Sequence, residues 1–193
     1  MDPAHRRGGR KPRRTVTERL EAGEITVYEA TELTREAVLN SLTASAKSRH
    51  ELAQSLARRG FPESAALTVL DRFEEVGLID DAGYADTLVR TRHAERGLAR
   101  RAIGQELRRR GIDDEVAAEA LAQVDDADEQ ESAARLAEKL IARSCGQARE
   151  ARIRKAASAL ARKGYSPGLA FAAVKNALSA EGEETNDLDI ADG

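Results

Sequence analysis

The sequence predicts an all-α protein made of a tandem repeat of three three-helix modules, which together form an elongated, curved rod. The chain has 193 residues, of which three are tyrosine, three are phenylalanine and none is tryptophan. This scarcity of aromatic and β-branched residues, beside abundant alanine, leucine, arginine and glutamate, favours helices and excludes a large β-sandwich. A motif that recurs three times, at a spacing of about fifty residues, indicates a modular helical array.

The recurring motif is a basic pair followed by glycine and a large apolar residue. It occurs at residues 58–61, 109–112 and 162–165, and its glycines lie 51 and 53 residues apart. A glycine in the left-handed conformation ends a helix, and the apolar residue after it packs back against the last turn. The basic pair stands at the carbonyl end of that helix, where positive charge is favourable. Each copy is therefore predicted as a helix, a glycine stop and a second helix.

In the first module, a leading helix is expected over residues 34–44 and a second helix over 48–59. Ser48 and Glu51 have the spacing of a capping box, which marks a helix start. The third helix is expected to open at Pro62, a residue suited to a first turn. Its apolar residues follow the i, i+3, i+4, i+7 spacing of a buried helical face. They are Ala66, Val69, Leu70 and Phe73.

The second and third modules follow the same order. Their leading helices are expected over residues 82–96 and 128–144, and their third helices open at Asp113 and Ser166, which suit helix caps. The buried faces of these third helices have the same spacing as in the first module. They comprise Ala117, Ala120, Leu121 and Val124 in the second module, and Ala170, Ala173, Val174 and Ala177 in the third. Stacked modules of this kind contact mainly their neighbours.

These elements divide the chain into three modules and two tails. The predicted boundaries are 1–31 for a basic, mostly disordered arm, 32–80, 81–127 and 128–180 for the modules, and 181–193 for an acidic, disordered tail. Residues 1–14 carry six basic side chains and one acidic, whereas residues 181–193 carry six acidic and no basic ones. Both ends have too little apolar surface to offset the entropy of ordering them. The basic arm suits contact with phosphate, or serves only as a solubilising tail.

The sequence contains no recognisable catalytic constellation. The three histidines are scattered, without metal-ligand spacing to one another or to the single Cys145. Cys145 is expected to be a small core thiol in a reducing compartment. We therefore predict a protein that is not an enzyme and uses no cofactor or metal. Since no apolar run has the length of a signal peptide or membrane span, we also predict a cytoplasmic protein without membrane contact. We further expect it to be a monomer.

The charge map of the modules indicates a binding surface. Residues 90–110 carry eight arginines and two acids, residues 149–163 carry six basic side chains and one acid, and residues 113–131 carry nine acids and no base. On a helix, Arg101 and Arg108 lie on one face because they are seven residues apart. A basic stripe suits a polyanion or an acidic protein surface. A surface of solvated salt bridges explains the same charges equally well.

The candidate binding residues are thirteen of the fourteen basic side chains of these two stretches, all except Arg154. They are Arg90, Arg92, Arg96, Arg100, Arg101, Arg108, Arg109, Arg110, Arg149, Arg152, Lys155, Arg162 and Lys163. No aromatic platform for stacking the bases of a single strand is expected. The larger aromatic residues are instead predicted at core or capping positions, namely Phe61, Phe73, Tyr165 and Phe171.

The middle module carries a family resemblance. The run 77–81 (Gly-Leu-Ile-Asp-Asp), Tyr84-Ala85, Arg96-Gly97 and the run 110–112 (Arg-Gly-Ile) closely resemble the RecX family of bacterial recombination regulators, and Arg90, Ile103 and Leu107 fit its pattern. Leu52, Leu56, Leu70 and the run 59–61 fit the first module of that family, and Gly164-Tyr165 fits the third. The resemblance covers about residues 32–180.

The resemblance implies tandem three-helix modules, in agreement with the repeat. It also implies that the protein binds the RecA recombinase filament on single-stranded DNA, lies in the filament groove, and suppresses ATP hydrolysis and strand exchange. By that analogy the basic residues would contact an acidic recombinase surface or nearby phosphates of single- or double-stranded DNA. Gly104 departs from a regular helix, because glycine weakens a helix interior relative to alanine. A non-sequence-specific nucleic-acid-binding helical protein is the alternative function.

Overall fold

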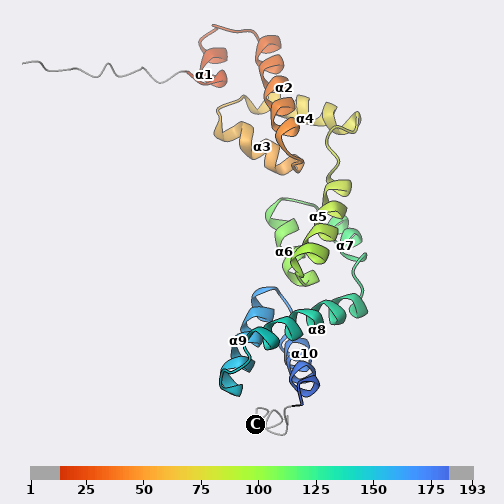
Figure 1. The fold of residues 1–193 in the computed structure, drawn as a ribbon. Helices are drawn as coiled ribbons and strands as arrows, with labels where there is room; N and C mark the ends of the chain where they lie inside the picture. The colour runs from red at the N-terminus through yellow and green to blue at the C-terminus, as the bar shows by residue number, and fades with distance from the viewer. Residues whose placement is uncertain (1–13, 183–193) are drawn as a thin grey trace, which may run out of the picture. The chain divides into compact units, whose positions relative to one another are not determined.

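The computed structural model describes residues 14–182, and all regular secondary structure in that range is α-helical (Figure 1). The chain divides into two compact units, one ending at Asp80 and the other beginning at Asp81. The all-α fold class predicted from composition is therefore confirmed. Within residues 14–182, no helix is both long enough and apolar enough to cross a membrane.

The first unit contains four helices within the described residues. They are α1 (Val16–Glu21), α2 (Val27–Ala44), α3 (Arg49–Arg58) and α4 (Glu63–Glu75). The side chains of α2, α3 and α4 enclose one apolar core. That core contains all four residues predicted for the third helix together with Ala37, Val38, Leu52, Leu56 and Ile79. The capping box predicted at Ser48 and Glu51 is present.

The amino-terminal arm predicted over residues 1–31 is wrong for its second half. Residues 16–21 form α1, and α2 begins at Val27, seven residues before the expected start. Two capping boxes start these helices, because the hydroxyls of Thr15 and Thr26 accept from the backbone N–H three residues on, and a glutamate reaches back in each. The first thirteen residues of the arm lie outside the described residues.

The second unit contains six helices within the described residues. They are α5 (Asp81–Arg96), α6 (Arg100–Arg109), α7 (Asp114–Leu121), α8 (Asp126–Arg143), α9 (Arg149–Arg162) and α10 (Pro167–Ala180). Two separate apolar cores lie here, one enclosed by α5, α6 and α7, and the other mainly by α8, α9 and α10. Each core therefore corresponds to one three-helix module.

The glycine stops of the repeat have the predicted geometry. Gly60, Gly111 and Gly164 all have positive φ, at 73°, 71° and 95°. In each copy the apolar residue after glycine donates its backbone N–H to the carbonyl of the leucine five residues earlier, at 3.1, 3.1 and 3.3 Å. This is the Schellman pattern, which satisfies carbonyls left open at a helix end. The prediction of helix, glycine stop and helix is confirmed in all three copies.

Two residues predicted in the core lie at the surface. Phe171 is 50% exposed, because it follows Ala170 by one position and is therefore rotated by about 100° from the buried face of α10. Cys145 is exposed. The preceding Ser144 is buried instead, and its hydroxyl donates to carbonyls in the last turn of α8.

Candidate binding surface

Two predicted binding residues, Arg92 and Arg110, are paired with one carboxylate of their own module. In the second module, the Arg92 guanidinium donates to both carboxylate oxygens of Glu106, at 2.8 and 2.7 Å, and Arg110 donates to the same group at 2.9 Å. Arg110 also donates to the Tyr84 hydroxyl at 2.6 Å. The hydrogen bond from Arg92, supported by Arg110, lowers the pKa of Glu106 to about 2. This cluster fixes α6 against α5.

Arg100, another of the predicted binding residues, joins the middle module to the third one. The backbone N–H of Arg100 donates to the Glu129 carboxylate at 2.8 Å, and its guanidinium pairs with Glu129 and Asp126. The contacts of Arg100 with Asp126 and Glu129 thereby hold the start of α6 against the start of α8. The Arg100 side chain is therefore part of the junction between the second and third modules.

The glycine turn of the third module lies directly against the start of α6. The backbone N–H of Ala99 donates to the Lys163 carbonyl at 2.9 Å. A Cβ atom added to Gly164 would stand 2.6 Å from the Cβ of Ala102, a distance that real Cβ atoms essentially never show. The Tyr165 hydroxyl donates to the Gly97 carbonyl at 3.1 Å. The two modules therefore meet backbone to backbone at this turn.

This junction also brings together basic side chains that are distant in sequence. The Nε of Arg101 donates to the Gly164 carbonyl at 3.2 Å, and the Lys163 ammonium donates to the Arg96 carbonyl. Arg101 and Lys163 belong to different basic stretches of the sequence. The junction therefore brings one residue of each stretch close to the other, while the expectation that the two stretches form one binding surface stays a prediction.

Arg152 does not lie on a binding surface. It is 3% exposed, and its guanidinium donates to the Ile141 carbonyl at 2.9 Å, to the Ser144 hydroxyl at 3.4 Å and to the Glu181 carboxylate. It connects the end of α8 to the end of α10. The inclusion of Arg152 among the candidate binding residues is therefore wrong. Its position four residues before the buried Ala156 of α9 is the sequence signal for this burial.

The remaining candidates are mostly at the surface. Arg149 and Lys163 are half-buried, whereas seven others are exposed. Those seven form no ion pair with any residue in the described range. They are Arg90, Arg96, Arg101, Arg108, Arg109, Lys155 and Arg162.

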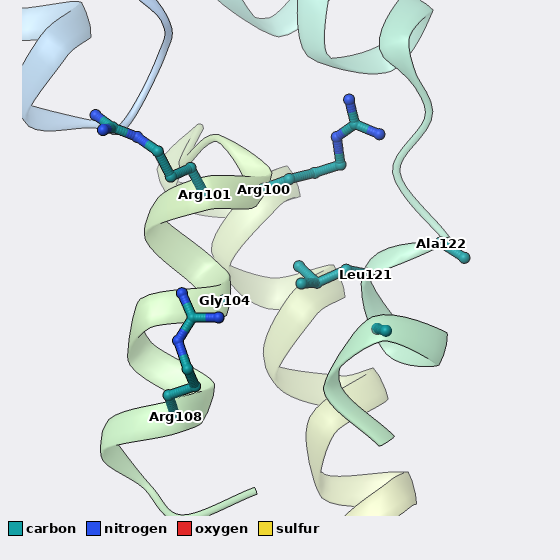
Figure 2. A pocket seen from close by; sticks show the side chains of 7 residues that line it. Arg100, Arg101, Gly104, Arg108, Leu121 and Ala122 are labelled. Atoms are coloured by element: carbon teal, nitrogen blue, oxygen red, sulfur yellow. The ribbon is translucent and has the colours of Figure 1, made fainter. Parts of the chain in front are cut away.

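Two of these exposed arginines flank a cleft on the second module (Figure 2). The cleft has a volume of about 350 Å³ and lies between α6 and α7. Arg101 and Arg108 are separated along α6 by about 10 Å, two helical turns, and Gly104 lies between them. The full lining consists of Arg100, Arg101, Gly104, Arg108, Ala118, Leu121 and Ala122.

Gly104 has a packing role that explains its place inside the helix. It is buried, and an added Cβ would stand 3.2 Å from Cδ1 of Leu121. The missing side chain lets α6 approach α7 closely, and Gly104 itself lines the cleft between the two arginines. Guanidinium groups bind carboxylates and phosphates through paired hydrogen bonds. Because no aromatic residue lines the cleft, it suits recognition of negative charge rather than stacking of bases.

Sequence reasoning missed a second surface feature, on the third module. Arg154 and Phe171 line one groove between α9 and α10. Arg154 lies in the second basic stretch, so its charge could have marked it as a surface candidate. Phe171 could not have been identified in this way, since its apolar character predicted burial.

Comparison with known proteins identifies the repeat. Residues 35–73, 80–121 and 127–174 match the first, second and third three-helix domains of RecX, respectively. The chain is 42% identical over 188 residues to the regulatory protein RecX of Streptomyces coelicolor, and the aligned region covers 97% of each chain. It is 43% identical over 148 residues to RecX of Thermobifida fusca, covering 77% of this chain and 80% of that relative.

A solved structure supports the same assignment. The crystal structure of RecX from Lactobacillus salivarius superposes with a TM-score of 0.69 at 25% sequence identity, covering 78% of this chain and 98% of that one. The three predicted three-helix modules are thereby confirmed, whereas the rod shape and the module boundaries stay predictions. Three domain matches in the expected order, together with a relative similar over nearly the whole length, show that the chain belongs to the RecX family of regulatory proteins.

Proposed function

We propose that the chain is a negative regulator of the RecA recombinase, which binds the recombinase filament on single-stranded DNA and suppresses ATP hydrolysis and strand exchange. It acts by binding rather than by catalysis, in the cytoplasm, as a monomer and without a cofactor. Membership of a family of regulatory proteins supports the regulatory role.

The observation that carries the proposal is the cleft beside α6. Arg101 and Arg108 are exposed there, without an ion pair in the described part of the chain, whereas Arg92 and Arg110 are paired with Glu106. An exposed guanidinium pair on a rigid helix can bind acidic side chains of a recombinase or the phosphates of its DNA. The Gly164 carbonyl positions Arg101 by holding its Nε.

The test is single-stranded-DNA-dependent ATP hydrolysis by the cognate recombinase, measured with rising amounts of the chain. Substoichiometric wild-type chain should slow hydrolysis. The double variant Arg101→Glu, Arg108→Glu should require roughly tenfold more protein, equivalent to about 1.4 kcal/mol of lost binding free energy. Its helicity should stay nearly unchanged because both side chains are exposed. Its free energy of unfolding should fall by no more than about 0.5–1.5 kcal/mol, the contribution of the hydrogen bond from Arg101 to the Gly164 carbonyl.

The matched control is Lys139→Glu, Arg143→Glu, which makes the same charge change on exposed positions of α8. It should inhibit like the wild type. No inhibition by wild-type chain at stoichiometric excess contradicts the proposal. Equal inhibition by the Arg101, Arg108 variant assigns the contact to another surface, and loss of folding in that variant assigns these arginines a structural role.

Non-sequence-specific nucleic-acid binding is the second candidate, favoured by a cleft that offers charge without an aromatic platform. It requires affinity for DNA in the absence of recombinase and a steep loss of that affinity with salt. Binding of this kind combined with no effect on recombinase would select it over the first proposal.

A further inference from the structure

The cleft beside α6 has two walls that differ in charge. Its α6 wall carries the exposed arginines Arg101 and Arg108 (Figure 2). Its α7 wall consists of Ala118, Leu121 and the C-cap residue Ala122. Helix α7 itself carries three acids and no base. The charge therefore changes sign from one side of the cleft to the other.

Two carboxylates of α7 lie beside the cleft on the same helix surface as its alanines. Glu115 stands three residues before Ala118, which makes the two side chains neighbours on the helix. Glu119 has the same relation to Ala122. Both glutamates are exposed, and neither forms an ion pair with a residue in the described range. Like charges four residues apart destabilise a helix, so this pair is unfavourable until a positive charge approaches it.

The strip between the two charged walls is apolar. Gly104 has no side chain there, and Leu121 is half-buried. Ala118 and Ala122 add exposed methyl groups. No residue that lines the cleft has a hydroxyl or amide side chain. The centre of the cleft therefore favours an apolar side chain, which gains from leaving water.

This distribution of charge disfavours a nucleic-acid strand. A strand carries a phosphate at every nucleotide, so it would bring negative charge against α7 as well as against α6. Packed helices lie about 8–10 Å apart, close to the Debye length of about 8 Å at physiological ionic strength. Repulsion from Glu115 and Glu119 would consequently act across the cleft. A protein segment, in contrast, carries charges of both signs together with apolar side chains.

We propose that the α6/α7 cleft binds a protein segment of its partner and not the phosphate backbone of DNA. The segment has an apolar side chain for the strip between the helices. Carboxylates on one edge face Arg101 and Arg108, and a basic side chain on the other edge faces Glu115 and Glu119. The inference deepens the proposed function and rests on it, because it takes the recombinase as the partner.

The test reverses the charge of each wall and measures the concentration of full-length chain that halves DNA-dependent ATP hydrolysis by the cognate recombinase. Arg108→Glu and Glu119→Lys should each raise this concentration about threefold, since exposed opposite charges stabilise a contact modestly. The double variant Arg108→Glu, Glu119→Lys keeps the net charge of the wild type. Its losses should nevertheless combine to about tenfold, as those of independent contacts do.

A ligand with negative charge alone gives the opposite results. Stronger inhibition by Glu119→Lys overturns the proposal, as does a double variant that inhibits like the wild type. Glu138→Lys is the matched control, because it makes the same charge change at an exposed position of α8, and it should leave inhibition unchanged. Glu119→Lys should not weaken α7, since a glutamate followed four residues later by a lysine stabilises a helix.

A second variant tests the apolar strip without changing charge. Ala118→Phe fills the cleft and should raise the half-inhibiting concentration several-fold, whereas Ala142→Phe, at an exposed position of α8, should not. Circular dichroism verifies that both variants are folded. Unchanged inhibition by both Ala118→Phe and Glu119→Lys overturns the proposal.

Binding of a fluorescein-labelled oligothymidylate, measured by anisotropy without recombinase, separates the two kinds of ligand. Glu119→Lys should change this affinity no more than Glu138→Lys does, and Ala118→Phe should not change it. A gain specific to Glu119→Lys, with a loss in Ala118→Phe, assigns the cleft to DNA and overturns the proposal. Wild-type chain that fails to inhibit at stoichiometric excess contradicts the proposed function and removes the partner assumed for the cleft. Inhibition by the wild type with the opposite effect of Glu119→Lys contradicts only the present inference.

Discussion

Replacing Gly164 by alanine is expected to damage the junction between the second and third modules. An added Cβ would stand 2.6 Å from the Cβ of Ala102, 3.0 Å from its backbone N and 3.3 Å from its Cα. No rotation of a side chain can relieve these contacts, so the turn and the start of α6 must separate. The hydrogen bond from Ala99 to the Lys163 carbonyl and the one from Arg101 to the Gly164 carbonyl depend on that approach.

The expected loss of unfolding free energy can be estimated by comparison with a matched glycine in the same unit. Gly146 has a φ of 85°, and an added Cβ there meets nothing within 4 Å. Gly146→Ala should lower the free energy of unfolding by about 1–2 kcal/mol, the strain of a non-glycine residue in the left-handed region. Gly164→Ala has the same strain and also weakens two junction hydrogen bonds, each contributing about 0.5–1.5 kcal/mol. We expect a total loss of about 2–5 kcal/mol.

Urea unfolding monitored by circular dichroism measures both variants. Hydrogen exchange at the Ala99 amide reports the junction directly, and its protection should fall in Gly164→Ala but not in Gly146→Ala. Equal destabilisation by the two variants, with Ala99 still protected, would refute the close packing of the junction. The first unit offers a second pair, since a Cβ on Gly60 would stand 2.5 Å from Thr15 whereas one on Gly77 meets nothing within 4 Å.

Two further predictions concern the internal ion pairs. The pKa of Glu106 is lowered to about 2 from 4.5, so its pairs with Arg92 and Arg110 stabilise the fold above about pH 4.5, and this stabilisation is lost as pH falls toward 2. After allowance for solvent screening, Glu106→Gln should lower the free energy of unfolding at pH 7 by on the order of 1–2 kcal/mol and flatten its dependence between pH 5 and 2; an unchanged slope in urea unfolding would contradict this. Arg152→Gln should lower it by about 2–4 kcal/mol because buried acceptors lose their donor, whereas the exposed neighbour Arg154→Gln should stay within about 0.5 kcal/mol. Thermal unfolding that ranks these two variants equally would show that Arg152 is not the anchor described.

The turn geometry could be predicted from sequence because its interactions are local. The hydrogen bond from Phe61 to Leu56 spans only five residues, and glycine is the residue for which positive φ carries no steric penalty. Helix starts depend on equally local signals. The capping box at Thr15 and Glu18 could have been predicted in the same way, although a six-residue helix such as α1 is marginal alone. Helix α1 is held by a contact distant in sequence, since the backbone N–H and hydroxyl of Thr17 both donate to the Gly60 carbonyl at 3.0 Å.

Whether an individual arginine is buried or exposed could not be predicted from charge density. Arg152 and Arg154 stand two residues apart in the same basic stretch, yet one is buried and the other exposed. The difference comes from acceptors on another helix, the Ile141 carbonyl and the Ser144 hydroxyl. The net charge of a segment counts both residues alike. Only the helical period, which places Arg152 in line with Ala156 and Leu160, separates them.

The glycine turns at Gly60 and Gly164 each end one helix and also pack against the start of another. At Gly60 and at Gly164 the glycine ends its own helix and also admits a second helix start, that of α1 in one case and that of α6 in the other. Lys163, the second residue of the basic pair that precedes Gly164, is thereby fixed against the second module, close to Arg101. The charge map left two explanations open, salt bridges and a basic binding surface. Salt bridges account for Arg92, Arg100 and Arg110, which pair with carboxylates, whereas a binding surface stays a proposal for the exposed arginines. In Arg101 the Nε donates to the Gly164 carbonyl at the junction, and the terminal nitrogens form no hydrogen bond or ion pair with a residue in the described range, which leaves them for the partner that the proposed function requires.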